Sequence, residues 1–189
     1  FLSRMSHEIR TPMNAIVGLS DLTEQLPGLP EKAQLNLGKV KASSHYLLSL
    51  INDILDMSRI ESGKMTLNCS PFSMDELLDN IESMLATDAE RRGLEFHIES
   101  NVYAETYLGD SVRLRQVLLN LLSNAFKFTN EGGSVTLRVD GAPAGQTDQA
   151  LTVQVIDTGV GIAPESQERV FQSFEQVGTS ISKSMGTGL

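Results

Sequence analysis

The sequence predicts a helical hairpin followed by a two-layer α+β domain, with helices on one face of a sheet. Apolar residues recur at intervals of three and four over residues 2–60, which is typical of amphipathic helices. From residue 64 onward, short β-type runs alternate with helical segments, an order that favours an α+β arrangement. The 189 residues suffice for two domains of this kind.

Two helices are predicted before residue 64. The first ends at a cluster of helix-breaking residues, Leu26–Pro30, and the second ends near Ser62-Gly63, where glycine suits a helix C-cap. Two long helices joined by a short loop make an antiparallel hairpin with a wide apolar face. That face can pair with a second copy as a four-helix bundle or pack on the rest of the same chain, and pairing is the simpler solution. The apolar stripes are Leu2, Met5, Ile9, Met13, Ile16, Leu19 and Leu22 in the first helix, and Leu35, Leu37, Val40, Leu47, Leu50, Ile51, Ile54, Leu55, Met57 and Ile60 in the second.

The elements after residue 64 are shorter. Apolar and polar residues alternate in Val135–Val139, which is the signature of a half-buried strand. Residues Asp140–Gln149 are rich in turn-forming residues and are predicted to be a hairpin loop. The predicted strands are Met65–Asn68, Phe96–Glu99, Ser134–Val139 and Leu151–Ile156, and the predicted helices are Met74–Glu90 and Ser111–Phe128.

Charge and composition exclude several classes of protein. The net charge of −9 argues against a nucleic-acid-binding protein, which normally carries a basic stripe. A single cysteine, Cys69, rules out an internal disulfide and a cysteine-rich zinc site. No apolar run approaches the roughly 18 residues of a membrane span, and the N-terminus lacks the apolar stretch of a signal peptide. We therefore expect a soluble, cytosolic piece of a longer protein.

The first candidate site is Ser6–Pro12, on the first helix. The apolar stripe occupies its neighbours, so His7 and Glu8 are expected to face solvent. A helical zinc site needs a second histidine four residues further on, and Thr11 occupies that position. Pro12 removes a backbone hydrogen bond and is expected to kink the helix. An exposed His–Glu pair beside a kink suits a reactive site; the alternative is a surface histidine without a role.

The second candidate site lies within residues 115–129. Asn120, Asn124 and Lys127 are four and three residues apart, so on a helix they form one polar row beside an apolar face. An amide oxygen is a suitable ligand for a hard cation, and a lysine ammonium suits phosphate. The alternative is a solvated helix face, but asparagine is a poor helix former and is an unusual choice there.

The third candidate site, Val155–Pro164, is a strand that runs into the sequence Asp157-Thr-Gly159-Val-Gly161. The two glycines let a ligand approach the backbone closely, and a carboxylate at a strand end can accept a hydrogen bond from an exocyclic amine. The third glycine of a dinucleotide-binding fingerprint is missing. The alternative is a plain connection between a strand and a helix.

The fourth candidate site is Gly186-Thr-Gly188-Leu189, which follows a small, polar stretch. Backbone N–H groups in such a loop can cradle phosphates. Two aromatic residues, Phe171 and Phe174, precede it and either belong to the core or position this loop.

In their order and spacing, these sites resemble the motifs of the histidine protein kinases of two-component signalling, most closely the hybrid sensor kinases. The matching segments are His7–Pro12 (the H box), Asn120–Thr129 (the N box), Asp157–Gly161 (the G1 box), Phe171–Phe174 (the F box) and Gly186–Gly188 (the G2 box). The resemblance implies a dimerisation and histidine phosphotransfer domain over residues 1–63. It also implies a Bergerat-type ATP-binding α+β sandwich over residues 64–189. Because the family continues with a helix and a strand, we expect the end of this domain to be missing.

The resemblance also implies roles for individual residues. His7 would be the phospho-acceptor, Glu8 would orient or deprotonate it, and Thr11 would position water for a phosphatase activity toward a partner regulator. ATP and Mg²⁺ would bind in the second domain. There Asn124 would ligate Mg²⁺, Asn120 and Lys127 would contact phosphate, Asp157 would bind the adenine amine, and Gly159, Gly161, Gly186 and Gly188 would shape the pocket and its lid.

The implied function is ATP-dependent autophosphorylation on histidine, with onward transfer to an aspartate of a response-regulator receiver domain. The implied assembly is a homodimer through residues 1–63, with no nucleic acid and no membrane contact by this fragment. The fragment would be the cytoplasmic portion of a parent protein anchored in the inner membrane.

Two alternatives share parts of this pattern. ATPases of the gyrase and chaperone type need a carboxylate one turn before the Mg²⁺-binding asparagine, and Asn120 stands there instead. A degenerate kinase that binds and regulates another kinase is the second alternative, although the motif residues are intact.

Overall fold

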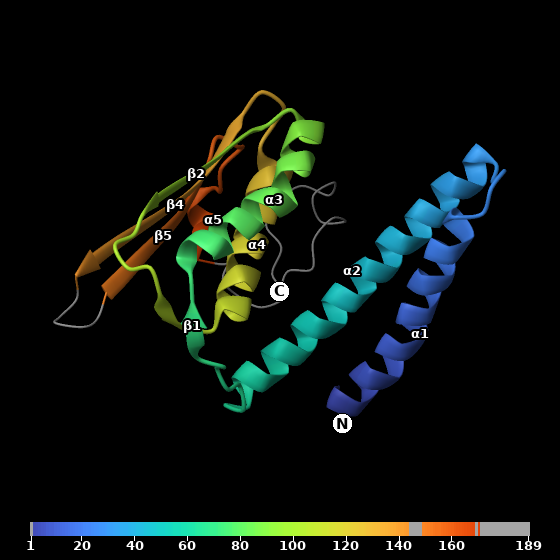
Figure 1. Cartoon of the computed structure of the whole chain (residues 1–189), viewed down its shortest axis with the longest axis horizontal. Helices are drawn as coiled ribbons and strands as arrows, with labels where there is room; N and C mark the ends of the chain where they lie inside the picture. The colour runs from blue at the N-terminus through green and yellow to red at the C-terminus, as the bar shows by residue number, and fades with distance from the viewer. Residues whose placement is uncertain (1, 144–148, 169, 171–189) are drawn as a thin grey trace. The chain divides into compact units, whose positions relative to one another are not determined.

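The computed structural model describes residues 2–143, 149–168 and 170. The chain has two compact units (Figure 1). One is an α/β unit over Thr66–Ala163, and the other contains the helical hairpin up to Met65 together with the segment that begins at Pro164. Within the described residues, no helix has the length and apolar character that a membrane span requires.

The hairpin consists of α1 (Leu2–Glu24) and α2 (Glu31–Glu61). α1 ends two residues before the predicted breaker cluster and α2 ends directly before Ser62-Gly63, so the expected hairpin is confirmed. α1 continues as one helix through Pro12.

Small and charged residues hold the two helices together. Ser20 and Ser44 are buried, and such small side chains let two helices approach closely. Near the loop, the Lys41 ammonium lies 2.7 Å from a carboxylate oxygen of Asp21 and 2.7 Å from one of Glu24. Hydrogen bonds to Asp21 and then to Glu24 raise the pKa of Lys41. α2 is thereby tied to the last turn of α1.

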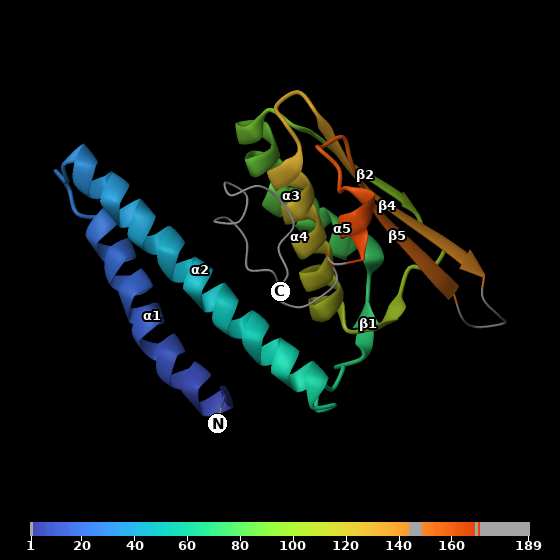
Figure 2. The ribbon, with the colours of Figure 1, turned by 180° about the vertical axis from the view of Figure 1, so that it is seen from behind.

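The α/β unit has two layers. α3 and α4 cover one face of a three-stranded sheet in the order β2-β4-β5, as the two opposite views agree (Figures 1 and 2). β2 runs parallel to β4, which pairs antiparallel with β5, and β1 and β3 form a separate antiparallel pair. The elements of this unit are β1 (Ser70–Phe72), α3 (Met74–Arg92), β2 (Glu95–Asn101), β3 (Tyr107–Gly109), α4 (Ser111–Phe128), β4 (Ser134–Pro143) and β5 (Gln149–Asp157). The short α5 (Pro164–Gln167) follows in the chain and belongs to the other compact unit.

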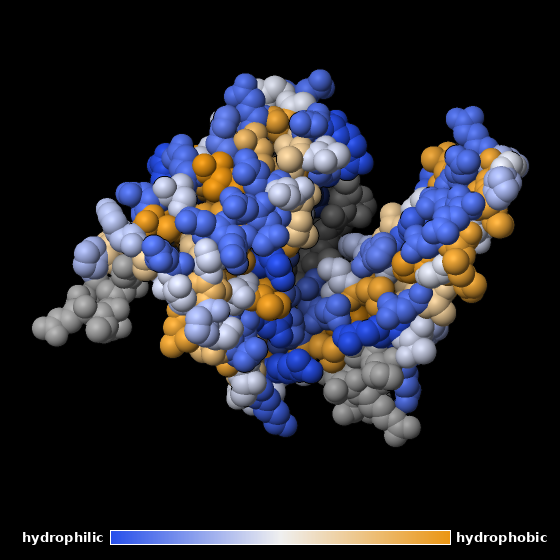
Figure 3. Space-filling model, in the orientation of Figure 1, coloured by the Kyte–Doolittle hydropathy of each residue, from blue (hydrophilic) through white to orange (hydrophobic). Residues whose placement is uncertain are grey.

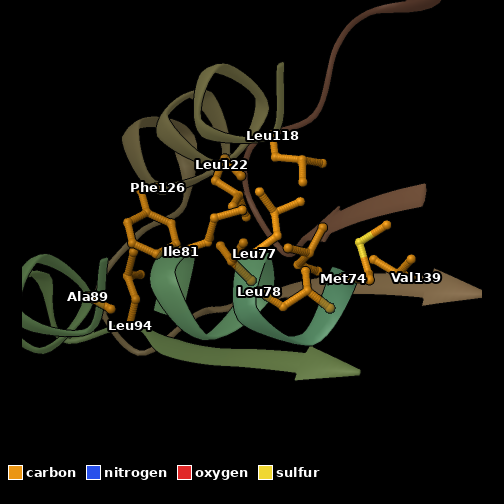
Figure 4. Packing of buried hydrophobic residues seen from close by; sticks show 13 residues of the cluster. Met74, Leu77, Leu78, Ile81, Ala89, Leu94, Leu118, Leu122, Phe126 and Val139 are labelled. Atoms are coloured by element: carbon orange, nitrogen blue, oxygen red, sulfur yellow. The ribbon is translucent and has the colours of Figure 1, made fainter. Parts of the chain in front are cut away.

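The hydrophobic core lies between these two layers (Figure 4). Alternate residues of the central strand β4 point into it, and Phe96 on β2 meets Phe126 on α4 edge to face, with ring centroids 5.2 Å apart. The buried side chains are Met74, Leu77, Leu78, Ile81, Ala89, Leu94, Leu118, Leu122, Ala125, Phe126, Val135, Leu137 and Val139. Burying about a dozen such side chains is the main stabilising contribution to this unit.

Several predicted boundaries change in the structure. The strand expected at Met65–Asn68 is wrong, since pairing begins only at Ser70, and the Asn68 N–H instead donates to the Asp110 carboxylate at 2.9 Å. Strand β3 is absent from the prediction, because three residues show no measurable alternation. The hairpin between β4 and β5 is confirmed, but its pairing extends to Pro143 opposite Gln149, so the predicted loop was too long.

Candidate functional site

The polar row of the N box lies on the side of α4 away from the core. Leu118, Leu122, Ala125 and Phe126 are buried against the sheet and α3. Asn120 and Asn124 are exposed, and Lys127 is half-buried. The Asp110 carboxylate caps the start of α4 by accepting from the Arg113 N–H at 3.1 Å. The helix therefore presents two amide groups and one ammonium along one line.

The last turn of α4 receives the loop that follows β5. The Val160 N–H donates to the Phe128 carbonyl oxygen at 3.3 Å, one residue after Lys127 in the chain. Gly159 packs so tightly there that a Cβ atom would overlap the same carbonyl oxygen. Thus the G1 box (Asp157–Gly161) and the N box (Asn120–Thr129), which lie on different elements, come together.

Asp157 is the last residue of β5 and pairs with Val135 on the central strand. Its side chain is exposed, and its Oδ1 accepts from the Gly159 N–H at 2.9 Å. Gly161 has a φ of +70°, a left-handed conformation that favours glycine. The loop therefore holds an outward carboxylate at the end of a strand and turns back at once toward α4.

Lys127 is a basic residue in the last turn of α4. Its Nζ lies 4.8 Å from the centroid of the Phe128 ring, within the range of a cation–π contact. Among the residues that the structure describes, no group of three His, Cys, Asp or Glu side chains could hold a metal ion. Asn124 lies about one turn before Lys127 on α4, is exposed and carries an amide oxygen, a type of ligand that hard cations accept.

The H box lies in the first half of α1. Glu8 and Thr11 are exposed. The Arg10 guanidinium donates to the Asn52 amide oxygen on α2 at 2.9 Å, a contact that the sequence gave no reason to expect. His7 belongs to α1 by its backbone, and its side chain lies outside the described part. Also outside it are Phe171, Phe174, Gly186 and Gly188.

Comparison with known proteins identifies the family. Residues 1–63 match the His Kinase A (phospho-acceptor) domain, and residues 109–189 match the histidine kinase-, DNA gyrase B- and HSP90-like ATPase domain. The chain belongs to the histidine kinase family. The description of the second model also names DNA gyrase B and HSP90, whereas that of the first names only a histidine kinase domain, so the first match separates this chain from gyrase-type and chaperone-type ATPases.

Individual relatives agree with that assignment. The chain is 40% identical over 192 residues to the signal transduction histidine-protein kinase BarA of Escherichia coli strain K12, a match that covers 100% of the chain and 21% of BarA. It is 35% identical over 189 residues to the autoinducer 2 sensor kinase/phosphatase LuxQ of Vibrio cholerae, covering 98% and 22% respectively. The chain therefore spans about a fifth of the length of these relatives.

A solved histidine kinase has the same fold. The structure of full-length ShkA in complex with AMPPNP matches with a TM-score of 0.74 and 32% identity, covering 99% of this chain and 38% of ShkA. The expected architecture, a helical hairpin followed by a Bergerat-type α/β ATPase domain, is thereby confirmed.

Proposed function

We propose that the complete protein is a sensor kinase that phosphorylates itself on His7 with ATP and passes the phosphoryl group to an aspartate of a response-regulator receiver domain. One observation carries this proposal. The chain joins a phospho-acceptor hairpin to an ATPase-type unit, in which the G1 loop contacts the last turn of the N-box helix through Phe128 and Val160. ShkA, which shares this architecture, was solved with AMPPNP.

ATP would bind where the two boxes meet. Mg²⁺ is usually held by one or two protein ligands together with substrate phosphates, so the amide oxygen of Asn124 suits it. Lys127 and Asn120 would contact phosphate, and the exposed Asp157 carboxylate would accept from the adenine amine. Gly159 and Gly161, with Gly186 and Gly188, would shape the pocket and its lid. Because the chain carries a net charge of −9, the metal and Lys127 would offset repulsion of the anionic nucleotide.

His7 would be the nucleophile. A neutral imidazole is nucleophilic near pH 7, and the neighbouring Glu8 is exposed beside it on α1. A ring nitrogen of His7 would attack the γ-phosphorus, so an N–P bond forms while the bond to the bridging oxygen of ADP breaks. Glu8 would take the ring proton. Thr11, one turn further along α1, would position water for phosphatase activity toward the partner regulator, an activity that the name of LuxQ also includes.

We propose that residues 1–63 form the dimerisation and phosphotransfer domain and that residues 64–189 form the catalytic domain. The hairpin leaves apolar side chains in solvent along both helices (Figure 3). Burying each is worth roughly 1.5–3 kcal/mol, so pairing with a second copy is strongly favoured. The side chains concerned are Ile16, Leu19 and Leu22 on α1, Leu26 in the loop, and Leu35, Val40, Tyr46, Leu47, Ile54 and Ile60 on α2.

The likeness to BarA and LuxQ also supports a proposal about the longer protein to which this segment belongs. Their names mark them as signal-transduction and sensor kinases. We propose that this segment is the cytoplasmic portion of a sensor anchored in the inner membrane, and that it contacts neither the membrane nor nucleic acid.

Labelling the complete protein with γ-labelled ATP and Mg²⁺ tests the activity. We expect an acid-labile, base-stable product, as for a phosphoramidate, and we expect His7→Gln to abolish it while nucleotide binding persists. His45→Gln is the matched control, because His45 is an exposed histidine on the second helix of the same hairpin. Label that survives His7→Gln would refute the assignment.

A further inference from the structure

We propose that Thr158, the residue between Asp157 and Gly159, is a positioning residue that acts on nucleotide binding by fixing the Asp157 carboxylate. This inference rests on the proposed ATP site. Its basis is the way in which the Thr158 side chain takes part in the pairing between β4 and β5.

The regular ladder between these strands ends where Val135 pairs with Asp157. One residue further on, the Thr158 N–H donates to the Ser134 carbonyl oxygen at 3.1 Å, as a regular antiparallel pair would. The second hydrogen bond of this residue pair is different, because the Ser134 N–H donates to Oγ1 of Thr158 at 2.9 Å. The hydroxyl therefore occupies the acceptor position that the Thr158 carbonyl oxygen would have in a regular ladder.

The replacement of the carbonyl oxygen by the hydroxyl as hydrogen-bond acceptor explains how the chain leaves the sheet. Since the side chain completes the pairing, the backbone after Thr158 is released from the ladder and can turn toward α4. There the Val160 N–H reaches the Phe128 carbonyl oxygen at 3.3 Å, and Gly159 packs against the same oxygen. The turn therefore starts one residue after Asp157, and the exposed Asp157 residue stays at the end of β5 beside the loop.

A second glycine makes room for the hydroxyl. A Cβ on Gly133 would lie 2.8 Å from Oγ1 of Thr158 and 2.5 Å from the Thr129 methyl carbon. Thr129 is itself buried at the end of α4, where its hydroxyl donates to the Ala125 carbonyl oxygen at 2.8 Å. Thr158 and Thr129 thus both lie close to Gly133, the residue just before β4.

Asp157 is consequently held on both sides. Before it, the ladder with β4 fixes the backbone, and after it, the N–H and the hydroxyl of Thr158 are both hydrogen-bonded to Ser134. Its Oδ1 accepts from the Gly159 N–H at 2.9 Å, so the carboxylate orientation depends on where Gly159 lies. Without the hydroxyl, the Ser134 N–H loses its acceptor and the carboxylate loses its fixed direction.

Calorimetric titration of the complete protein with adenosine and with ATP tests this role. We expect Thr158→Val to weaken both ligands by the same factor, roughly three- to tenfold, the amount that one lost hydrogen bond implies. Thr158→Ser retains the hydroxyl and should keep wild-type affinity. Thr152→Val makes the same substitution at an exposed position of β5 and is the matched control. If Thr158→Val fails to fold, Thr158→Ala removes the same acceptor.

The double variant with Asp157→Asn distinguishes positioning from a direct contact. If Thr158 acts through Asp157, adding Thr158→Val to Asp157→Asn should cause no further loss of adenosine affinity. If the two substitutions lower adenosine affinity additively, Thr158 does not act through Asp157 and the inference is overturned. The same holds if Thr158→Val keeps wild-type affinity while Asp157→Asn lowers it. Either result would leave the proposed ATP site intact. A wild-type protein that binds neither ligand would instead overturn the proposed function.

Discussion

Gly159 shows how a single residue can control whether two motifs meet. Any side chain there would overlap the Phe128 carbonyl oxygen, so the G1 loop could no longer lie against the last turn of α4. The polar row on α4 and the Asp157 carboxylate form one candidate site only through this contact. A backbone approach of this kind is the usual reason for a glycine that no turn conformation demands.

We therefore expect Gly159→Ala to lower both the melting temperature and the affinity for ATP. Gly38→Ala is the matched control, because Gly38 lies within α2 with open space around it. Alanine is favoured over glycine inside a helix by roughly 0.5–1 kcal/mol, so the control should melt no lower than wild type. Wild-type ATP affinity in Gly159→Ala would show that the loop need not contact α4.

Three further variants separate metal, phosphate and adenine contacts. Removing one partner of a buried charged contact costs ~2–5 kcal/mol, which corresponds to ~30-fold or more in affinity. Asn124→Ala should remove the Mg²⁺ dependence of ATP binding, and Lys127→Ala should weaken ATP more than adenosine. Asp157→Asn should weaken both alike, because it acts on adenine. Calorimetry with ATP, ADP and adenosine gives the pattern, and unchanged adenosine affinity in Asp157→Asn would contradict this placement.

At the scale of elements, one carboxylate organises the start of the N-box helix. Asp110 caps α4 through the Arg113 N–H and also accepts from the Asn68 N–H, 42 residues earlier in the chain. Hydrogen bonds from the backbone of Asn68 and then of Arg113 lower the pKa of this carboxyl below its ordinary value of 3.8. The charged form is thus favoured in the folded state.

The contribution of the Asp110 carboxylate to the stability of the folded state depends on pH. Because the folded-state pKa of Asp110 is lowered, its contribution is fully present above the unfolded value near 3.8 and is lost as the pH falls through the folded value. We expect Asp110→Ala to melt below wild type at pH 7, with the difference narrowing as the pH falls below 3.8. Thermal unfolding measured across pH tests this, with Asp79→Ala on α3 as the control. A difference independent of pH would contradict the capping role.

At the scale of the whole molecule, the hairpin and the α/β unit are stabilised in different ways. The α/β unit has a closed core of thirteen buried apolar residues, whereas the hairpin buries only Ser20 and Ser44 among its described residues. An exposed apolar stripe of that length favours a partner, and we propose that a second copy of the hairpin completes a four-helix bundle.

We accordingly expect the protein to be a dimer by light scattering at micromolar concentration. Ile54→Glu should weaken the dimer, because Ile54 is an exposed apolar residue of α2. Leu108→Glu is the control, since Leu108 is 76% exposed on β3, outside the hairpin. A monodisperse wild-type monomer, or equal loss of dimer in both variants, would contradict the proposed interface.

The sequence predicted both the helices and the three strands of the β2-β4-β5 sheet, and the structure confirms them. α4 begins and ends where expected, at Ser111 and Phe128, because periodicity, a capping aspartate and a terminating turn are all local features. The short strand β3 and the irregular course of Met65–Asn68 were missed, since pairing partners outside the segment decide both. Propensity over three or four residues is too weak to predict them.

For the candidate site, the sequence predicted the residues but not the contacts that bring them together. Residue types and spacing alone determined the polar row of Asn120, Asn124 and Lys127 and the carboxylate of Asp157, because a helix repeat and a strand end are readable within a few residues. Only the tertiary structure decided that the G1 loop meets α4 at Phe128 and that Thr158 completes the pairing with Ser134. That last contact joins residues 24 positions apart through hydrogen bonds, which leave no periodic trace in the sequence.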